Sequence, residues 1–146
     1  MNPRLSYREA EVQGASRVRL VILLYEQAIE DLRRALAAHS QRDIQVRTRE
    51  INHAILVLGH LQGSLDKRQG GQVAANLERF YTLVRAGLVE AQCKQSAELL
   101  EQQISLLLQV RDAWCQVART EIVDAPSRSA QARAAGEPST STDWNA

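Results

Sequence analysis

The sequence has few of the residues on which disulfide-bonded, strand-rich or membrane-spanning proteins depend. Its 146 residues include 3 prolines, 2 cysteines and only 4% aromatic residues. Cys93 and Cys115 form no CxxC pair and are too few for a disulfide scaffold, so we interpret them as small buried hydrophobic residues. The longest uninterrupted apolar run, from Leu20 to Tyr25, is far shorter than the roughly 20 residues of a membrane-spanning helix. No signal-peptide pattern opens the chain, and we therefore expect a cytoplasmic protein.

An excess of charge of one sign is also missing. The formal net charge is +1, which creates no long-range field that would attract nucleic acid or an anionic membrane. Hydrophobic residues make up 45% of the chain and charged residues 24%, a balance that supports one domain with a single core. Ala, Leu, Gln, Glu and Arg are abundant, and these residues lose little rotamer freedom in a helix. The composition therefore predicts an all-α fold.

Apolar residues recur in steps of three and four, the spacing of a helix face, in four stretches. The first helix is predicted to begin at Ser16, a good N-cap. The second begins near Asp43 or Ile44 and closes at Gly70 and Gly71. The third starts beyond these glycines and fades near Cys93, and the fourth is capped by Ser96. The positions that define the four stripes are Val18, Ile22, Tyr25, Ile29, Leu32 and Leu36; Ile51, Ile55, Leu58 and Leu65; Val73, Leu77, Phe80, Val84 and Ala91; and Leu100, Leu107, Val110, Trp114 and Val117.

Short connections between these helices force neighbours to run antiparallel, which predicts an up-down-up-down four-helix bundle over residues 16–118. Residues 1–15 precede the bundle. Residues 125–146 are rich in Ala, Ser, Thr, Pro and Gly and lack a periodic apolar face, so we predict a disordered C-terminal tail.

Motifs for chemistry are nearly absent. Gly70 and Gly71 are not part of a phosphate-binding loop, since the GxxxxGK[ST] spacing is missing, and we interpret them as a turn between helices. Glu50 and His53 form a single ExxH pair, whereas a ferritin-like metal site needs two such pairs and two further glutamates. We expect His53 and His60 to lie on a solvated face. The sequence predicts neither an enzyme nor a bound metal or cofactor.

What the sequence has in surplus is apolar surface. At about 100° per residue, some apolar side chains of the first two helices point away from the core stripes. Gly59 and Gly63 also allow another backbone to approach closely. These side chains either form a hydrophobic groove for a helical or extended ligand, or are buried because bundle helices have wide apolar stripes. The residues concerned are Leu20, Leu23, Leu24, Val46, Leu56 and Val57.

The N-terminal segment, residues 1–15, contains Tyr7 and Val12 and is predicted to lie across this groove as a lid. Without its lid, the groove would expose apolar side chains to water.

The stretch GGQVAANLERFYTLV from Gly70 to Val84, preceded by SLD, resembles the signature of the flagellar export chaperone family FliS. The agreement extends to LVILLYEQAIEDLRRAL in the first helix and INHAIL in the second, and covers about Ser6 to Val117. The chain departs from the family at Ser16-Arg17, where the family usually has Ser-Pro, and in its longer tail. The motif positions that match are Tyr7, Leu24, Tyr25, Gly70, Gly71, Ala74, Asn76, Leu77, Tyr81 and Trp114.

The resemblance implies a four-helix chaperone that binds the C-terminal segment of flagellin one-to-one, without ATP. Binding would prevent polymerisation in the cytoplasm and keep flagellin competent for type III export. The family is also associated with the export gate and an anti-sigma factor as further partners. By resemblance, Asn76 and Tyr81 join the candidate flagellin-binding residues, although both are equally suited to satisfying polar groups inside the bundle. The alternatives are a helical adaptor or homodimer that uses the same groove, and a ferritin-like metal-binding bundle.

Overall fold

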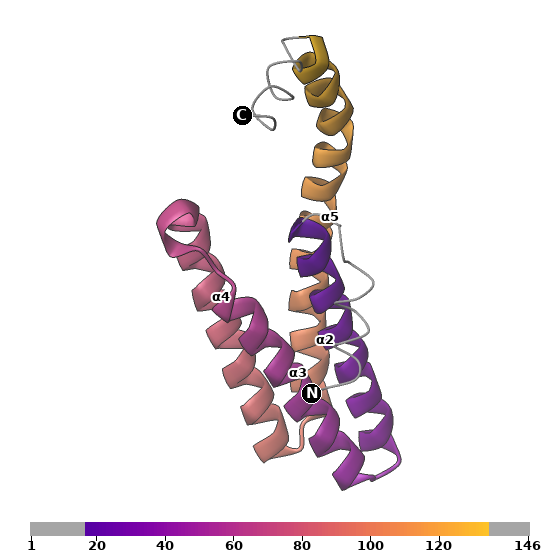
Figure 1. Cartoon of the computed structure of the whole chain (residues 1–146). Coiled ribbons are helices and arrows are strands. Elements are labelled where there is room, and N and C mark those ends of the chain that lie inside the picture. Colours follow the sequence, from indigo (N-terminus) through magenta and orange to yellow (C-terminus); the bar gives the residue numbers. More distant parts are fainter. Residues whose placement is uncertain (1–16, 135–146) are drawn as a thin grey trace, which may run out of the picture.

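The computed structural model describes residues 17–134, with the side chains of residues 121–134 excepted. Four helices follow one another along the chain (Figure 1). They are α2 (Arg17–Ser40), α3 (Ile44–Gly63), α4 (Lys67–Lys94) and α5 (Ala97–Ala134). The predicted all-α fold is thus confirmed. Tyr7, Val12 and the rest of the predicted lid segment lie outside the described residues.

The helices are arranged in a ring. Each contacts the helix before it and the helix after it in the chain, and α5 closes the ring by packing on α2. Successive helices run in opposite directions (Figure 1), which confirms the antiparallel up-down-up-down bundle. The largest contact is between α2 and α3, whereas α4 packs less extensively on α3 and α5.

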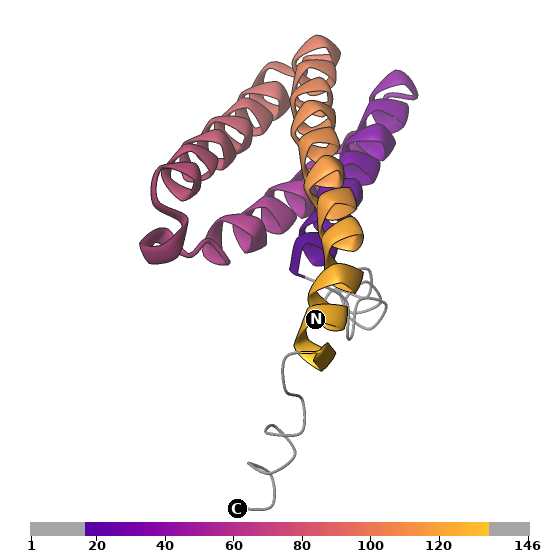
Figure 2. The same ribbon diagram turned by 90° about the horizontal axis from the view of Figure 1, so that it is seen from above.

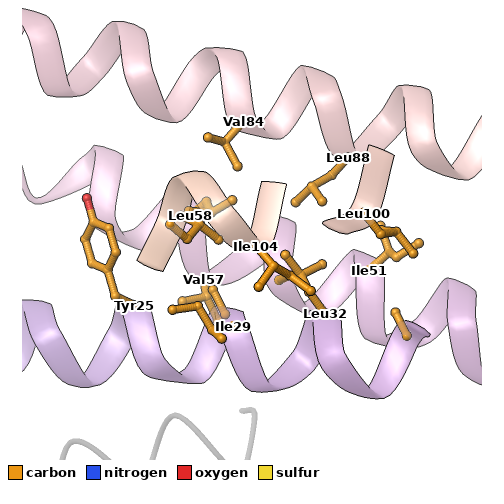
Figure 3. Packing of buried hydrophobic residues seen from close by; sticks show 14 of the residues in the cluster. Tyr25, Ile29, Leu32, Ile51, Val57, Leu58, Val84, Leu88, Leu100 and Ile104 are labelled. Atoms are coloured by element: carbon orange, nitrogen blue, oxygen red, sulfur yellow. The ribbon is translucent and has the colours of Figure 1, made fainter. Parts of the chain in front are cut away.

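The core lies where all four helices meet (Figure 3). Val84 and Leu88 of α4 face Leu58 and Ile51 of α3, with side chains of α2 and α5 completing the cluster. Burying each large apolar side chain contributes on the order of 1.5 to 3 kcal/mol, so this cluster is the main source of bundle stability. Most predicted stripe residues lie in it or pack against it, including Tyr25, Leu32, Leu100 and Leu107.

Local capping explains where two of the helices start. The side chain of Asp43 accepts a hydrogen bond from the backbone N–H of Val46 at 3.1 Å. The Ser96 hydroxyl accepts one from Leu99 N–H at 3.1 Å. Both satisfy N–H groups that the first turn of a helix leaves without a partner. The predicted starts of the second and fourth helices are therefore confirmed.

The boundary between α3 and α4 differs from the prediction. We expected α3 to continue to Gly70 and Gly71, but it ends at Gly63, and α4 begins at Lys67. The cause is the intervening Ser64-Leu65-Asp66. Ser64 caps α3 with its hydroxyl on Leu61 O at 2.9 Å, while the Asp66 carboxylate accepts hydrogen bonds from Arg68 and Gln69 N–H at 3.1 and 3.2 Å. Asp is a strong N-cap, and it starts the next helix early.

Gly71 is non-helical, and two helical segments of α4 meet at a kink there. The predicted turn at Gly70 and Gly71 is therefore confirmed, although the segment before it is a short one that begins at Lys67. Gly71 has φ 53° and ψ −129°, a left-handed conformation that residues with a side chain rarely adopt. At Gly70 a Cβ atom would lie 2.6 Å from that of Ala74, so a side chain there would clash. Both positions require glycine, and the bend turns the first turn of α4 away from the rest of the helix (Figure 2).

The helix α5 projects beyond the other helices (Figures 1 and 2) and ends at Ala134. Its last residues overlap the predicted tail, residues 125–146, and the disorder of that tail stays a prediction. The segment from 127 to 134 is rich in Ala, Arg and Gln, which favour helix even without tertiary contacts. Residues 135–146 lie outside the described residues.

The two cysteines are more exposed than predicted. Cys93 is exposed and Cys115 is partly exposed, so the expectation that both are buried is wrong. Cys93 is exposed because it lies at the C-terminal end of α4, beyond the core.

In the part of the chain that the structure describes, every helix is too short or too polar to span a membrane.

Candidate functional site

A cleft opens at the end of the bundle where α2 and α4 begin. The first half of α4 contributes little to the core, since Ala74 is its only buried residue before Tyr81. The space left between α4 and the N-terminal turns of α2 has a volume of about 330 Å³. Most of its wall is apolar and comes from all four helices: Val18, Leu20, Val21, Leu24, Leu61, Leu65, Val73, Ala74, Leu77, Tyr81 and Trp114.

One side of the cleft is fixed by a pair of tyrosines. The Tyr25 hydroxyl of α2 donates a hydrogen bond to the Tyr81 hydroxyl of α4 at 2.9 Å, and the ring centroids are 6.1 Å apart. Both residues are buried, at 0% and 1% exposure. Burial raises the pKa of both hydroxyls, most strongly that of Tyr25, because the ionised form would lose its hydration. Since the backbones of α2 and α4 are not in direct contact, this neutral pair braces the bundle across its diagonal.

The rim of the cleft is exposed. Val73 keeps 65% of its surface accessible, and Leu20 and Leu24 are half-buried. Water therefore covers apolar side chains here, at a cost that a bound apolar group would remove. Three residues that the sequence assigned to an apolar binding surface, Leu20, Leu24 and Tyr81, do line the cleft.

Leu23 and Val57 do not line an open surface, and the predicted placement of both is corrected. Leu23 is 7% exposed and Val57 is fully buried in the core. The reason is that α2 packs against α3 on one side and α5 on the other, and α3 likewise lies between α2 and α4. The buried stripe on each helix is therefore wider than a single seam.

The other candidate binding residues that the structure describes do not line the cleft. Leu56, with 49% exposure, belongs to the outer face of α3, in a shallow hollow of about 810 Å³ that Gly59, Gly63 and Arg85 also line. A Cβ atom at either glycine would meet no atom within 4 Å, so this face is open. Val46 is half-buried near the start of α3. Asn76 is exposed, accepts a hydrogen bond from Gln72 at 2.9 Å, and does not line the cleft.

Sequence reasoning missed several cleft residues because it assigned them to the core. Val18, Val73 and Leu77 belong to the predicted stripes of their helices, and Trp114 ends the stripe of the fourth. Periodicity shows which face of a helix is apolar, but it does not show whether another helix covers that face. The available signal was the adjacent pair Gly70 and Gly71, because α4 is kinked there, within the part of the helix that borders the cleft.

A buried polar cluster joins α2 to α3 and corrects the prediction for His53. This histidine is 7% exposed, and its Nδ1 is hydrogen-bonded to the carboxylate of Asp31, which is fully buried. Arg34 donates to Asp31 at 2.6 Å and to Glu50 at 2.8 Å. His53 is buried because its helix face packs on α2, where Asp31 provides the partner that a buried imidazole needs. His60 is exposed, as predicted.

The ExxH pair thus serves packing between helices. Glu50 binds Arg34 and His53 binds Asp31, so both side chains already have partners inside the protein. Among the described residues, no three His, Cys, Asp or Glu side chains gather in a way that could hold a metal ion.

The family model described as "Flagellar protein FliS" matches residues 1–121 of the chain. The chain is 37% identical over 106 residues to the flagellar secretion chaperone FliSB of Pseudomonas aeruginosa, an alignment that covers 73% of this chain and 84% of the relative. It is 29% identical over 111 residues to the flagellar secretion chaperone FliS of Salmonella typhimurium, with 75% and 82% covered. With the FliS of Bacillus subtilis the identity is 24% over 123 residues, with 84% and 91% covered.

Proposed function

The chain belongs to the FliS family, whose named relatives are flagellar secretion chaperones, and on this premise we propose that it is an export chaperone for flagellin. In this proposal it binds the disordered C-terminal segment of flagellin one-to-one in the cytoplasm. The bound segment cannot polymerise, and flagellin stays competent for flagellar type III export. The protein carries out no chemistry of its own. The family's further partners, the export gate and an anti-sigma factor, stay predictions from the resemblance.

The observation that carries this proposal is the apolar cleft at the open end of the bundle. A disordered segment loses conformational freedom when it folds onto a partner, so it needs several apolar anchors to bind well. The cleft offers partly exposed apolar side chains from α2 and α4, among them Leu20, Leu24 and Val73. An apolar surface of this kind suits an amphipathic helix or an extended apolar strand.

The direct test is a calorimetric titration of the full-length protein with the C-terminal segment of flagellin from the same cell. We expect saturable binding near one-to-one, with a gain of helical circular dichroism as the segment becomes ordered. An N-terminal flagellin segment of equal length serves as the control. If the C-terminal segment does not bind, the chaperone proposal is wrong.

A second candidate function is a helical adaptor or homodimer that uses an open apolar face. The open face of α3 favours this alternative, because Leu56 is 49% exposed there beside Gly59 and Gly63. The oligomeric state of the purified chain, measured by analytical ultracentrifugation, distinguishes the two candidate functions. A monomer that binds flagellin supports the chaperone, whereas a stable dimer without flagellin affinity supports the alternative.

Deleting residues 1–15 is expected to increase the binding of a hydrophobic dye while leaving helical circular dichroism unchanged. The proposed reason is that this segment, with Tyr7 and Val12, shields the cleft until a client displaces it. Arg17, the first residue of α2, lines the cleft. The deletion of residues 135–146 serves as the control. Unchanged dye binding together with unchanged flagellin affinity would show that no lid exists.

A further inference from the structure

At the other end of the bundle lies a buried cation without a counter-charge. Arg47 of α3 is only 5% exposed, yet no carboxylate of the described residues forms an ion pair with it. Its one side-chain hydrogen bond runs from Nη1 to Nδ1 of His39 at 3.3 Å, and its Nε is buried with no partner. Burying a guanidinium in this way costs stability unless an anion accompanies it.

Arg47 lines a hollow of about 510 Å³. The hollow is lined by residues from the α2–α3 turn and from the α4–α5 turn. Both turns lie at the same end of the bundle (Figure 1). Arg42 borders the hollow from the first turn, with a left-handed φ of 59°, and Gln95 borders it from the second. The other lining residues are His39, Ser40 and Ile44. Two arginines and a histidine therefore surround a space whose lining includes no acidic residue.

The hydrogen bond between Arg47 and His39 determines which ring nitrogen of His39 is the acceptor. A guanidinium can only donate, so Nδ1 of His39 accepts and carries no proton. His39 also lines the hollow, and its other ring nitrogen, Nε2, is able to donate a hydrogen bond. The arrangement presents hydrogen-bond donors from Arg47, Arg42 and His39 without a protein acceptor for the Arg47 Nε–H.

The helix dipoles do not explain why Arg47 is buried beside His39 and Arg42. His39 and Arg42 lie at the C-terminal end of α2, where positive charge is favourable. Arg47, however, lies near the N-terminal end of α3, where the dipole disfavours a cation and favours an anion. The two acidic residues nearest to Arg47 along the chain have other partners: Glu50 pairs with Arg34 and Arg49, and Asp43 caps α3 at Val46 N–H.

We propose that this hollow is a binding site for an oxyanion of the phosphate class, held by Arg47, Arg42 and His39. Arginine forks match the oxygen geometry of a phosphate group and bind it through charge-assisted hydrogen bonds. The hollow is wide enough for a phosphate that carries a substituent, so the ligand is either free phosphate or a phosphate monoester. The site is independent of the proposed flagellin site, because the cleft lies at the opposite end of the bundle.

The test is a titration of the full-length protein with inorganic phosphate, replacing chloride at constant ionic strength, followed by NMR of backbone amides and the His39 ring. We expect saturable shifts at His39, Arg42 and Arg47 at millimolar phosphate, and a higher melting temperature. Phenyl phosphate in place of phosphate shows whether a monoester binds more tightly, and acetate shows whether a carboxylate suffices. Shifts that stay linear with phosphate, or equal shifts with acetate, would overturn the proposal.

Two substitutions locate the site. Arg47→Gln is expected to weaken phosphate binding by about tenfold, because charge-assisted hydrogen bonds are lost. Without phosphate, this variant should melt no lower than the parent, since it removes a buried unpaired charge. Arg42→Gln changes an exposed residue, keeps the fold, and should weaken binding severalfold. The control is Arg33→Gln, an exposed arginine of the same bundle outside the hollow. Equal phosphate affinity in all three variants would refute the site.

Discussion

Val73→Asp is expected to weaken binding of the flagellin C-terminal segment by at least about tenfold, which corresponds to 1.4 kcal/mol or more. Val73 lines the cleft and is 65% exposed, so a carboxylate there is tolerated in the free protein. When a client covers it, the charge loses its water and meets an apolar side chain, at a cost of roughly several kcal/mol. Leu24→Asp, from the α2 side of the cleft, should act in the same direction.

Leu83→Asp is the matched control for this substitution. Leu83 lies on the same helix, α4, with nearly the same exposure, 64%, but it does not line the cleft. The measurement is calorimetry with the flagellin segment, after circular dichroism confirms that each variant is folded. Arg33→Glu, on a solvated part of α2, should change the affinity little. If Leu83→Asp reduced binding and Val73→Asp did not, the client would bind elsewhere on the bundle.

Val57→Asp would not test the binding surface, although the sequence placed Val57 among the candidate residues. Val57 has no exposed surface and packs in the core. An aspartate at this position would bury an unpaired charge and unfold the bundle, so any loss of binding would follow from loss of the fold.

The second large effect concerns stability. Asp31→Ala is expected to lower the free energy of unfolding by about 3 kcal/mol, because it leaves the buried side chains of Gln27 and His53 without their hydrogen-bond acceptor. Asp31 is fully buried and accepts hydrogen bonds from Gln27, Arg34 and His53. The measurement is urea unfolding followed by circular dichroism.

Glu26→Ala provides the control, since it removes a carboxylate from the same helix. Glu26 is 39% exposed, and its ion pair with Arg111 is 3.8 Å long, so its loss should cost less than about 1 kcal/mol. In the double variant Asp31→Leu with His53→Leu, part of the lost stability should return, because the buried imidazole is removed together with its acceptor. Equal effects of Asp31→Ala and Glu26→Ala would contradict the structural role of the cluster.

The elements that sequence reasoning predicted well depend on local signals. Asp43 and Ser96 start helices through hydrogen bonds to residues three positions away, and the apolar stripes follow from helical spacing. The end of α3 was missed although its signal is equally local, because the apolar stripe at Leu65 seemed to continue the helix. In the structure, the N-cap preference of Asp66 outweighs that stripe.

The features that sequence reasoning did not predict depend on contacts between distant residues. Asp31 and His53 are 22 positions apart, and nothing in the neighbourhood of either residue indicates the other. Arg47 lacks a carboxylate partner among the described residues, and this likewise depends on which residues of the two turns surround it at one end of the bundle. The cleft was predicted only in part, since Leu20 and Leu24 mark one wall while the opposite wall depends on how far α4 leans from the core.

The hydroxyl pair of Tyr25 and Tyr81 has a consequence for how a client is received. It connects two helices whose backbones do not touch, and it does so beside the cleft. This hydrogen bond links α2 to α4 in the free protein, so under the proposed function the cleft is partly preorganised for its client. Most of the ordering entropy of complex formation then falls on the incoming chain. Under the proposed function, we expect clients that fit the same spacing of α2 and α4 to compete with one another.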